Sequence, residues 1–103
     1  MNAASFSYSL FEYTPRDILN DERLDDADRR VATWVACHNR FGGRNEVPDL
    51  EFSARFCALS IEVFQRSEER LRAFGFLATQ RNPASPTGEC WRLRFREETY
   101  GGR

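Results

Sequence analysis

The sequence contains no lysine, a single histidine and only three cysteines. All 15 basic residues are therefore arginines, which reflects either a GC-rich genome or a need for planar donors that pair with phosphate or carboxylate. Because the cysteines are odd in number and form no Cys-x-x-Cys pair, the sequence predicts neither a disulfide scaffold nor a metal site. We expect a protein of the reducing cytoplasm that uses no cofactor.

Long apolar runs are also absent. No run comes near the ~20 residues of a membrane helix, and the N-terminus lacks a signal-peptide pattern, so we expect no membrane association. Catalytic motifs are missing too, since there is no Gly-x-Ser-x-Gly and no phosphate-binding glycine loop. His38 and its neighbour Cys37 would project about 100° apart on a helix. We interpret His38 as a core or boundary residue and expect no enzymatic activity.

The chain of 103 residues contains 41% apolar and 14% aromatic residues, which is enough apolar material for the core of one small domain. Charge is unevenly placed along it. Residues 1–28 hold two arginines and seven acids, whereas residues 29–103 hold thirteen arginines and nine acids. The sequence thus predicts an acidic N-terminal extension, residues 1–24, a mildly basic domain, residues 25–98, and a flexible tail, residues 99–103.

The N-terminal part predicts one strand followed by helices. Residues 5–13 alternate polar and apolar side chains, which is the period of a half-buried strand. Thr14 and Pro15 predict the N-cap and the first position of a short helix. A longer helix is expected from Asp25 to the glycines at 42–43. Its apolar residues recur every three or four positions and so share one face: Ala27, Val31, Trp34, Val35, His38 and Phe41.

The remaining elements alternate helices with short strands. An extended segment over residues 44–47 precedes a helix over 49–58. This helix has Leu50 at its start and is expected to bury Phe52, Phe56 and, just past its end, Leu59. Ser60 predicts the N-cap of a helix over 61–74 that ends at Gly75 and turns inward Phe64, Ser67, Leu71 and Phe74. Residues 76–81 and 89–96 predict two strands joined by a loop. On the second strand, Trp91, Leu93 and Phe95 face away from Arg92, Arg94 and Arg96.

Residues 60–77, SIEVFQRSEERLRAFGFL, resemble the third helix and first wing strand of bacterial winged helix-turn-helix regulators and replication initiators. Ser60 matches the family's helix cap, Phe64 and Leu71 match inner positions, and residues 73–77 match the glycine-containing ending. The resemblance covers residues 25–96 and implies an α+β fold, a winged helix-turn-helix with an extra N-terminal strand and short helix. Glu68 departs from the pattern. Either Ser67 takes the packing position while Glu68 pairs with an arginine, or the helix is rotated.

The resemblance implies a transcriptional regulator that binds double-stranded DNA, with the helix of residues 61–74 in the major groove and the wing, residues 81–96, on the backbone. Arg66 suits guanine and Gln65 suits adenine, while a glutamate can accept from cytosine. The implied DNA-binding residues are Glu62, Gln65, Arg66, Glu69, Arg70, Arg81, Arg92, Arg94 and Arg96, with Arg72 on the flank. The alternative is a solvated helix face and a wing whose arginines pair with Glu89, Glu97 and Glu98.

Such regulators usually act as homodimers. The candidate dimerisation residues lie in the aromatic N-terminal segment, which would also suit a strand that caps the core of a monomer: Phe6, Tyr8, Leu10, Phe11 and Tyr13. A competing hypothesis is a phage or mobile-element protein that binds a host protein, such as an inhibitor of a nucleic-acid-binding complex. The mixed charge at Glu62 and Glu69 suits a protein partner, whereas DNA needs a positive patch. Oxidation of Cys37 and Cys57 is a further hypothesis for regulation.

Overall fold

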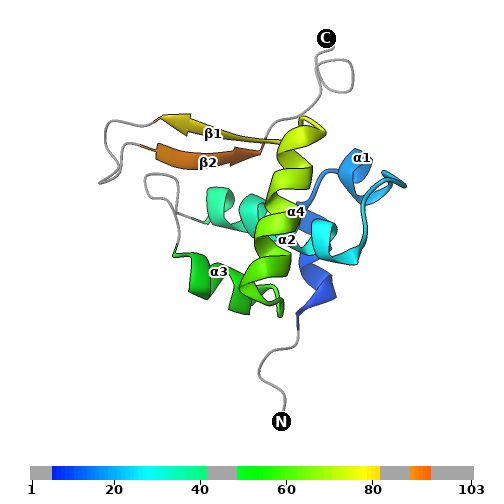
Figure 1. Cartoon of the computed structure of the whole chain (residues 1–103). Helices are drawn as coiled ribbons and strands as arrows, with labels where there is room; N and C mark the ends of the chain where they lie inside the picture. Colours follow the sequence, from blue (N-terminus) through cyan, green and yellow to red (C-terminus); the bar gives the residue numbers. More distant parts are fainter. Residues whose placement is uncertain (1–5, 42–48, 82–88, 94–103) are drawn as a thin grey trace.

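The computed structural model describes residues 6–41, 49–81 and 89–93. In chain order the elements are η1 (a 3-10 helix, Tyr8–Tyr13), α1 (Arg16–Leu19), α2 (Asp26–Arg40), α3 (Leu50–Phe56), α4 (Ile61–Ala73), β1 (Leu77–Arg81) and β2 (Glu89–Leu93). In Figure 1, α4 crosses in front of α2, and the strand pair and α1 lie on opposite sides of α4. The described part of the chain is therefore mainly helical.

The predicted strand over residues 5–13 is wrong, because the described part of this segment forms η1. A 3-10 helix places residues three apart on one side. Tyr8 and Phe11 accordingly pack edge to face, with ring centroids 5.4 Å apart, and both rings contact Phe6. Phe6 in turn is buried against Phe56 of α3. In a strand Tyr8 and Phe11 would point to opposite faces, so packing of the aromatic rings decides this local structure.

The short helix after Pro15 is confirmed as α1, but it begins one residue later than expected and its N-cap is Pro15. Thr14, the expected cap, makes a different contact. Its hydroxyl lies 2.7 Å from the hydroxyl of Thr33 on α2, and both residues are buried. This contact fixes the start of α1 against α2, and Ile18 of α1 is fully buried in the core.

The long helix is confirmed as α2, and its acidic start has a defined role. Asp25 is the N-cap and forms a capping box with Asp28, in which each carboxylate accepts a hydrogen bond from the other residue's backbone N–H. The expectation of one buried face is too narrow. Residues 31–35 are all buried, because α4, η1, α1 and β2 pack around the helix. Phe41, expected on the inner face, is instead 65% exposed at the helix end.

The helix over residues 49–58 is confirmed as the shorter α3, with Asp49 as its N-cap. The prediction that it buries Phe52 is wrong, since that side chain is 53% exposed. α3 instead buries Ser53, Ala54 and, just after its end, Cys57. Small side chains allow a close approach to the core, so the large ring is left on the outside.

α3 and α4 end in the same backbone motif. After α4, the N–H of Phe76 donates to the carbonyl of Leu71, and the N–H of Gly75 donates to the carbonyl three residues earlier. These are the two bonds of a Schellman motif, and Gly75 takes the left-handed position with φ +85°. The predicted end of this helix is thus confirmed. After α3, Leu59 and Ala58 donate in the same way, and Ala58 has φ +58°.

The strands β1 and β2 pair antiparallel, with Leu77 opposite Leu93 and Arg81 opposite Glu89. Residues 82–88 between them lie outside the described residues, as does the predicted extended segment 44–47. The predicted fold class, an α+β winged helix-turn-helix with an extra N-terminal strand, is wrong. The described residues are mainly helical and form η1 in place of the predicted N-terminal strand, and the single β1–β2 pair does not by itself show a winged helix. The resemblance rested on a cap, a helix and a glycine ending, which are local patterns that do not fix how helices are arranged.

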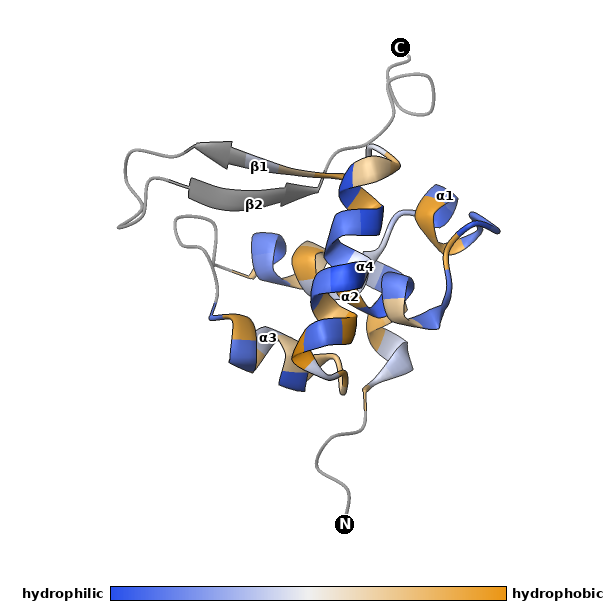
Figure 2. Cartoon of the chain, viewed as in Figure 1, coloured by the Kyte–Doolittle hydropathy of each residue, from blue (hydrophilic) through white to orange (hydrophobic). Residues whose placement is uncertain are grey.

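The core lies between α2 and α4. Val31 and Val35 of α2 meet Phe64 and Leu71 of α4, and all four side chains are fully buried. The predicted inner positions of α4 are therefore confirmed. Figure 2 shows that much of the viewed side of α4 is hydrophilic, so this helix keeps one face for solvent or a partner.

Candidate functional site

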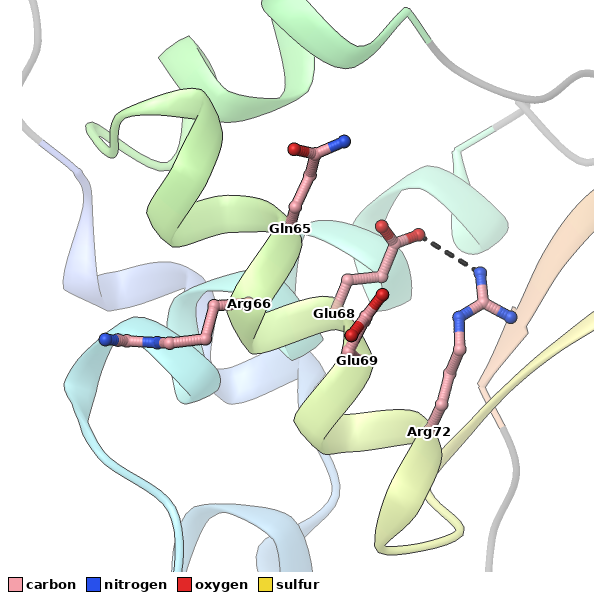
Figure 3. A pocket seen from close by; sticks show the side chains of 5 residues that line it. All are labelled: Gln65, Arg66, Glu68, Glu69 and Arg72. Atoms are coloured by element: carbon pink, nitrogen blue, oxygen red, sulfur yellow. Dashed lines mark hydrogen bonds and ion pairs between the residues drawn. The ribbon is translucent and has the colours of Figure 1, made fainter.

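The outward face of α4 carries the side chains that the sequence singled out for DNA. Glu62, Gln65, Arg66 and Glu69 are all exposed. The middle of this face is a shallow hollow of about 690 Å³, drawn in Figure 3 and lined by Gln65, Arg66, Glu68, Glu69 and Arg72. The structure thus leaves these four expected residues on the exposed side of α4.

Arg66 points away from the other side chains of this face, toward the start of α2 (Figure 3). Its guanidinium lies 3.5 Å from the carboxylate of Asp25, and both side chains are more than half exposed. Burial acts to raise the pKa of Asp25. The N–H of Asp28 and the charges of Arg66 and Arg70 outweigh burial, so that the pKa lies below its ordinary value. An ion pair this exposed contributes little to stability.

Arg70 has a more buried partner. Its Nε donates to the carboxylate of Asp28 at 2.9 Å, and its Nη2 donates to the carbonyl oxygen of Arg23 at 2.6 Å. Asp28 is fully buried, and its other carboxylate oxygen has no hydrogen-bond partner among the described residues. A buried carboxylate is costly without a cation. Arg70 therefore ties α4 to the first turn of α2 and to the segment before it, which gives it a structural role.

Of the two alternatives for Glu68, the structure shows the first. Ser67 is fully buried at the packing position, and Glu68 pairs with Arg72 at 3.2 Å. Arg72 also donates to the hydroxyl of Thr79 on β1. All three arginines of α4 are thus ion-paired within the chain, and the helix holds three acids against three arginines. α4 therefore presents no net positive charge.

The arginines predicted on the wing lie partly or wholly outside the described residues. The backbones of Arg81 and Arg92 belong to β1 and β2, but their side chains lie outside the described residues. Arg94 and Arg96 lie outside them entirely. DNA binding would need a positive patch shared by the helix and the wing. α4 contributes no net positive charge to such a patch.

A second surface, which the sequence reasoning missed, is an apolar hollow at the C-terminal end of α2. We call it the aromatic hollow. Its volume is about 400 Å³, and its lining comes from η1, α2 and α3: Leu10, Trp34, Cys37, His38, Phe41 and Phe56. A hollow of this size and apolar character is typical of binding sites. The sequence signal that could have found it is the aromatic content, 14% of the chain with nine phenylalanines.

Trp34 is the centre of the ring contacts at this hollow. Its ring centroid lies 4.6 Å from that of Phe56 and 5.3 Å from that of His38. His38 is half-buried, which fits its interpretation as a boundary residue. Phe52 packs on Trp34 from α3, with centroids 5.7 Å apart, while its ring remains 53% exposed. Phe41, which lines the hollow, and Phe52, which lies beside it, are thus large, solvent-exposed rings.

The candidate dimerisation residues are divided between the core and this surface. Phe6 is buried, whereas Tyr8 is 52% exposed and its hydroxyl is hydrogen-bonded to Asp26 and Arg30. Leu10 lines the aromatic hollow. Phe11 packs on Phe6 and Tyr8, and Tyr13 packs edge to face on Phe41. The N-terminal segment therefore supports the hollow from one side.

Cys37 and Cys57 are both free and buried. Burial raises the pKa of Cys57 to about 12, and it also raises the pKa of Cys37 against the opposing charge of Arg40. A thiol with a raised pKa holds little thiolate at neutral pH and reacts slowly. This geometry gives no support to oxidation of these two cysteines as a switch.

The described residues also bear on two other features, a metal site and a membrane-spanning helix. No three histidine, cysteine, aspartate or glutamate side chains come together there as a metal site would require. Nor is any helix among these residues both long and apolar enough to cross a membrane. Comparison of the chain with protein-family models, with curated proteins and with solved structures found no match.

Proposed function

We propose that this protein acts by binding another protein through the aromatic hollow. The observation that carries the proposal is the exposure of Phe41 and Phe52, 65% and 53%, beside an apolar hollow. Aromatic anchors that enter apolar pockets supply much of the binding free energy in protein interfaces. Exposed apolar surface next to such a pocket is a cost to an isolated domain unless a partner covers it.

The charges of α4 favour a protein partner over DNA. Affinity for duplex DNA depends on arginines that replace the counterions of its phosphates. Arg66, Arg70 and Arg72 each face a carboxylate of the chain itself, so a phosphate would have to displace that carboxylate. DNA binding by α4 is the competing hypothesis, and it requires at least Arg66 to leave Asp25.

The proposed activity is binding alone, with neither catalysis nor a cofactor. We place the protein in a reducing compartment such as the cytoplasm. The support for this is that Cys37 and Cys57 are free thiols in the described structure.

Selection of a random peptide library on the immobilised protein tests the proposal. Peptides enriched on the native chain should bind less to Phe41→Ser, which removes an exposed ring of the hollow without opening the core. They should bind equally to Ile61→Ser, a matched control that removes a 39% exposed apolar side chain at the start of α4. If no enriched peptide depends on Phe41, the proposal is wrong.

The competing hypothesis has its own measurement. Fluorescence anisotropy with random-sequence duplex DNA, at about 50 mM and about 200 mM salt, measures the electrostatic part of binding. We expect no binding that weakens steeply with salt. If the protein binds duplex DNA tightly and in a salt-sensitive way, and Arg66→Ala reduces that binding, then DNA binding by α4 is the function instead.

A further inference from the structure

Phe52 and the aromatic hollow together form a protruding ring beside a recess. Phe52 projects from α3 and is 53% exposed, yet its ring centroid lies only 5.7 Å from that of Trp34, which lines the hollow. Protrusion and recess therefore belong to one small patch of the surface. This is the arrangement that a two-fold symmetric interface requires, because both partners must present the same patch to each other.

We infer that the protein docked at the hollow is a second copy of this chain, with Phe52 of each copy inserted into the aromatic hollow of the other. The inference rests on the proposed function, since it names the partner at the same site. A hollow of about 400 Å³ has room for a phenyl ring, and its lining offers Trp34, Phe41 and Phe56 as aromatic neighbours. Rings from two copies would then pack edge to face or offset, as aromatic pairs prefer.

The charges around the patch are compatible with self-association. Exposed Glu51 and Arg55 flank Phe52 on α3, and exposed Arg40 lies over the rings of Tyr13 and Phe41. Arg40 thus lies at the hollow and Glu51 beside Phe52, so insertion of Phe52 would bring unlike charges of the two copies toward each other. A rim of this kind can pair unlike charges with its own copy. The whole chain has a net charge of -1, so two copies repel each other little.

The apolar area that two copies would bury indicates the expected affinity of the dimer. At about 200 Å² for a whole phenylalanine, the exposed fractions of Phe41 and Phe52 amount to about 240 Å² per copy. Two copies would bury about 470 Å² of aromatic surface, against about 1,600 Å² for a standard interface. The polar rim must supply the rest. We therefore expect a dimer of moderate affinity, seen only when the protein is concentrated.

Sedimentation equilibrium of the full chain over a wide concentration range measures this association. The native chain should move from 12.0 kDa toward twice that mass as concentration rises. Phe52→Ser should weaken dimerisation by about 100-fold, because each dimer loses two anchors worth about tenfold each. Ile61→Ser, the matched exposed control, should leave the dimer unchanged. Phe52 is exposed, so its replacement leaves the core intact.

A photo-cross-linker placed at position 52, as p-benzoylphenylalanine, gives an independent readout. Cross-links between copies should map to Leu10, Phe41 and Phe56, which line the hollow. A dimer that both serine variants weaken equally, or cross-links that map elsewhere, would overturn the inference. A monomer at every concentration would also overturn it. If the protein is a monomer but binds peptides in a Phe41-dependent way, the proposed function still holds. If it is a monomer and no such peptide binding is found, both the proposed function and the inference of a dimer are wrong.

Discussion

Two arginines one turn apart on α4 should differ sharply in their contribution to the free energy of unfolding. Arg66 and Arg70 each pair with an aspartate near the start of α2, Asp25 and Asp28 respectively. The pairs differ in burial, since Asp28 is fully buried and the side chain of Asp25 is 55% exposed. Alanine at each position therefore tests whether burial, more than charge pairing itself, decides what an arginine of α4 does.

The expected magnitudes follow from that difference. Removing one partner of a buried ion pair costs about 3–5 kcal/mol, because the other charge is left uncompensated. The Arg70 side chain is 38% exposed, so water can partly replace it, and we expect about 3 kcal/mol for Arg70→Ala. The Arg66 pair is exposed on both sides and 3.5 Å apart, so Arg66→Ala should cost about 0.5 kcal/mol.

Urea unfolding followed by circular dichroism measures both variants against the native chain. In thermal unfolding, the same losses correspond to a fall in Tm of about 12–24 °C for Arg70→Ala and about 2–4 °C for Arg66→Ala. If Arg70→Ala does not fold, Arg70→Lys keeps the charge but cannot reach both Asp28 and the carbonyl of Arg23. That variant should lose about 1–2 kcal/mol.

A double-mutant cycle identifies the cause. With Asp28→Asn in the background, no buried charge is left behind, so Arg70→Ala should cost about 2 kcal/mol less than it does in the native chain. Equal losses for Arg66→Ala and Arg70→Ala would refute the reasoning. So would a cycle without coupling, because Arg70 would then act through packing on Phe74 and not through Asp28.

Three further predictions concern other parts of the fold. Gly75 and Ala58 both hold the left-handed position of a Schellman motif. Gly75→Ala should therefore lower the free energy of unfolding by about 1 kcal/mol, and Ala58→Gly should raise it by a similar amount. Chemical denaturation of the two variants checks the opposite signs. Asp25→Asn keeps an N-cap but removes a carboxyl group whose folded pKa is lowered. The native chain should therefore lose stability as the pH falls below about 4, through the lowered folded pKa, and the variant should lose less, which unfolding curves across acidic pH will show. Cys57 is buried and has a pKa of about 12, so it should resist a thiol reagent at pH 8 in the folded protein and react after denaturation. Peptide mass spectrometry measures the labelling, and rapid labelling of the native protein would contradict the burial of Cys57.

The parts of the fold that the sequence predicted well are those decided within a few residues. Ser60 predicts the start of a helix because its hydroxyl can satisfy an N–H group three positions ahead. Asp25 marks the start of another because the helical periodicity begins there, and the structure adds its role as N-cap. Gly75 was recognised as an end because few other residues adopt positive φ without strain. The inner positions of α4 followed from helical periodicity, which needs no knowledge of the partner helix.

The parts that failed depend on contacts between distant segments. The alternation of residues 5–13 suits a strand, yet Phe6 finds its partner in Phe56, fifty positions later, and the segment coils into η1. Phe52 sits in a helix with smaller neighbours, so the side of α3 that touches the core was not set by hydrophobicity alone. The arginines of α4 were candidates for DNA because sequence shows charge but not its partner.

The sequence by itself determined where α2, α3 and α4 begin and where α4 ends, since caps and left-handed turns are short-range interactions. Only the tertiary structure decided which side chains remain available for function. It placed Asp25 and Asp28 against Arg66 and Arg70, which cancels the charge of α4. It also left Phe41 and Phe52 exposed around Trp34. Burial and charge pairing arise from segments that meet in space, and that is why the aromatic hollow was visible only once the chain was folded.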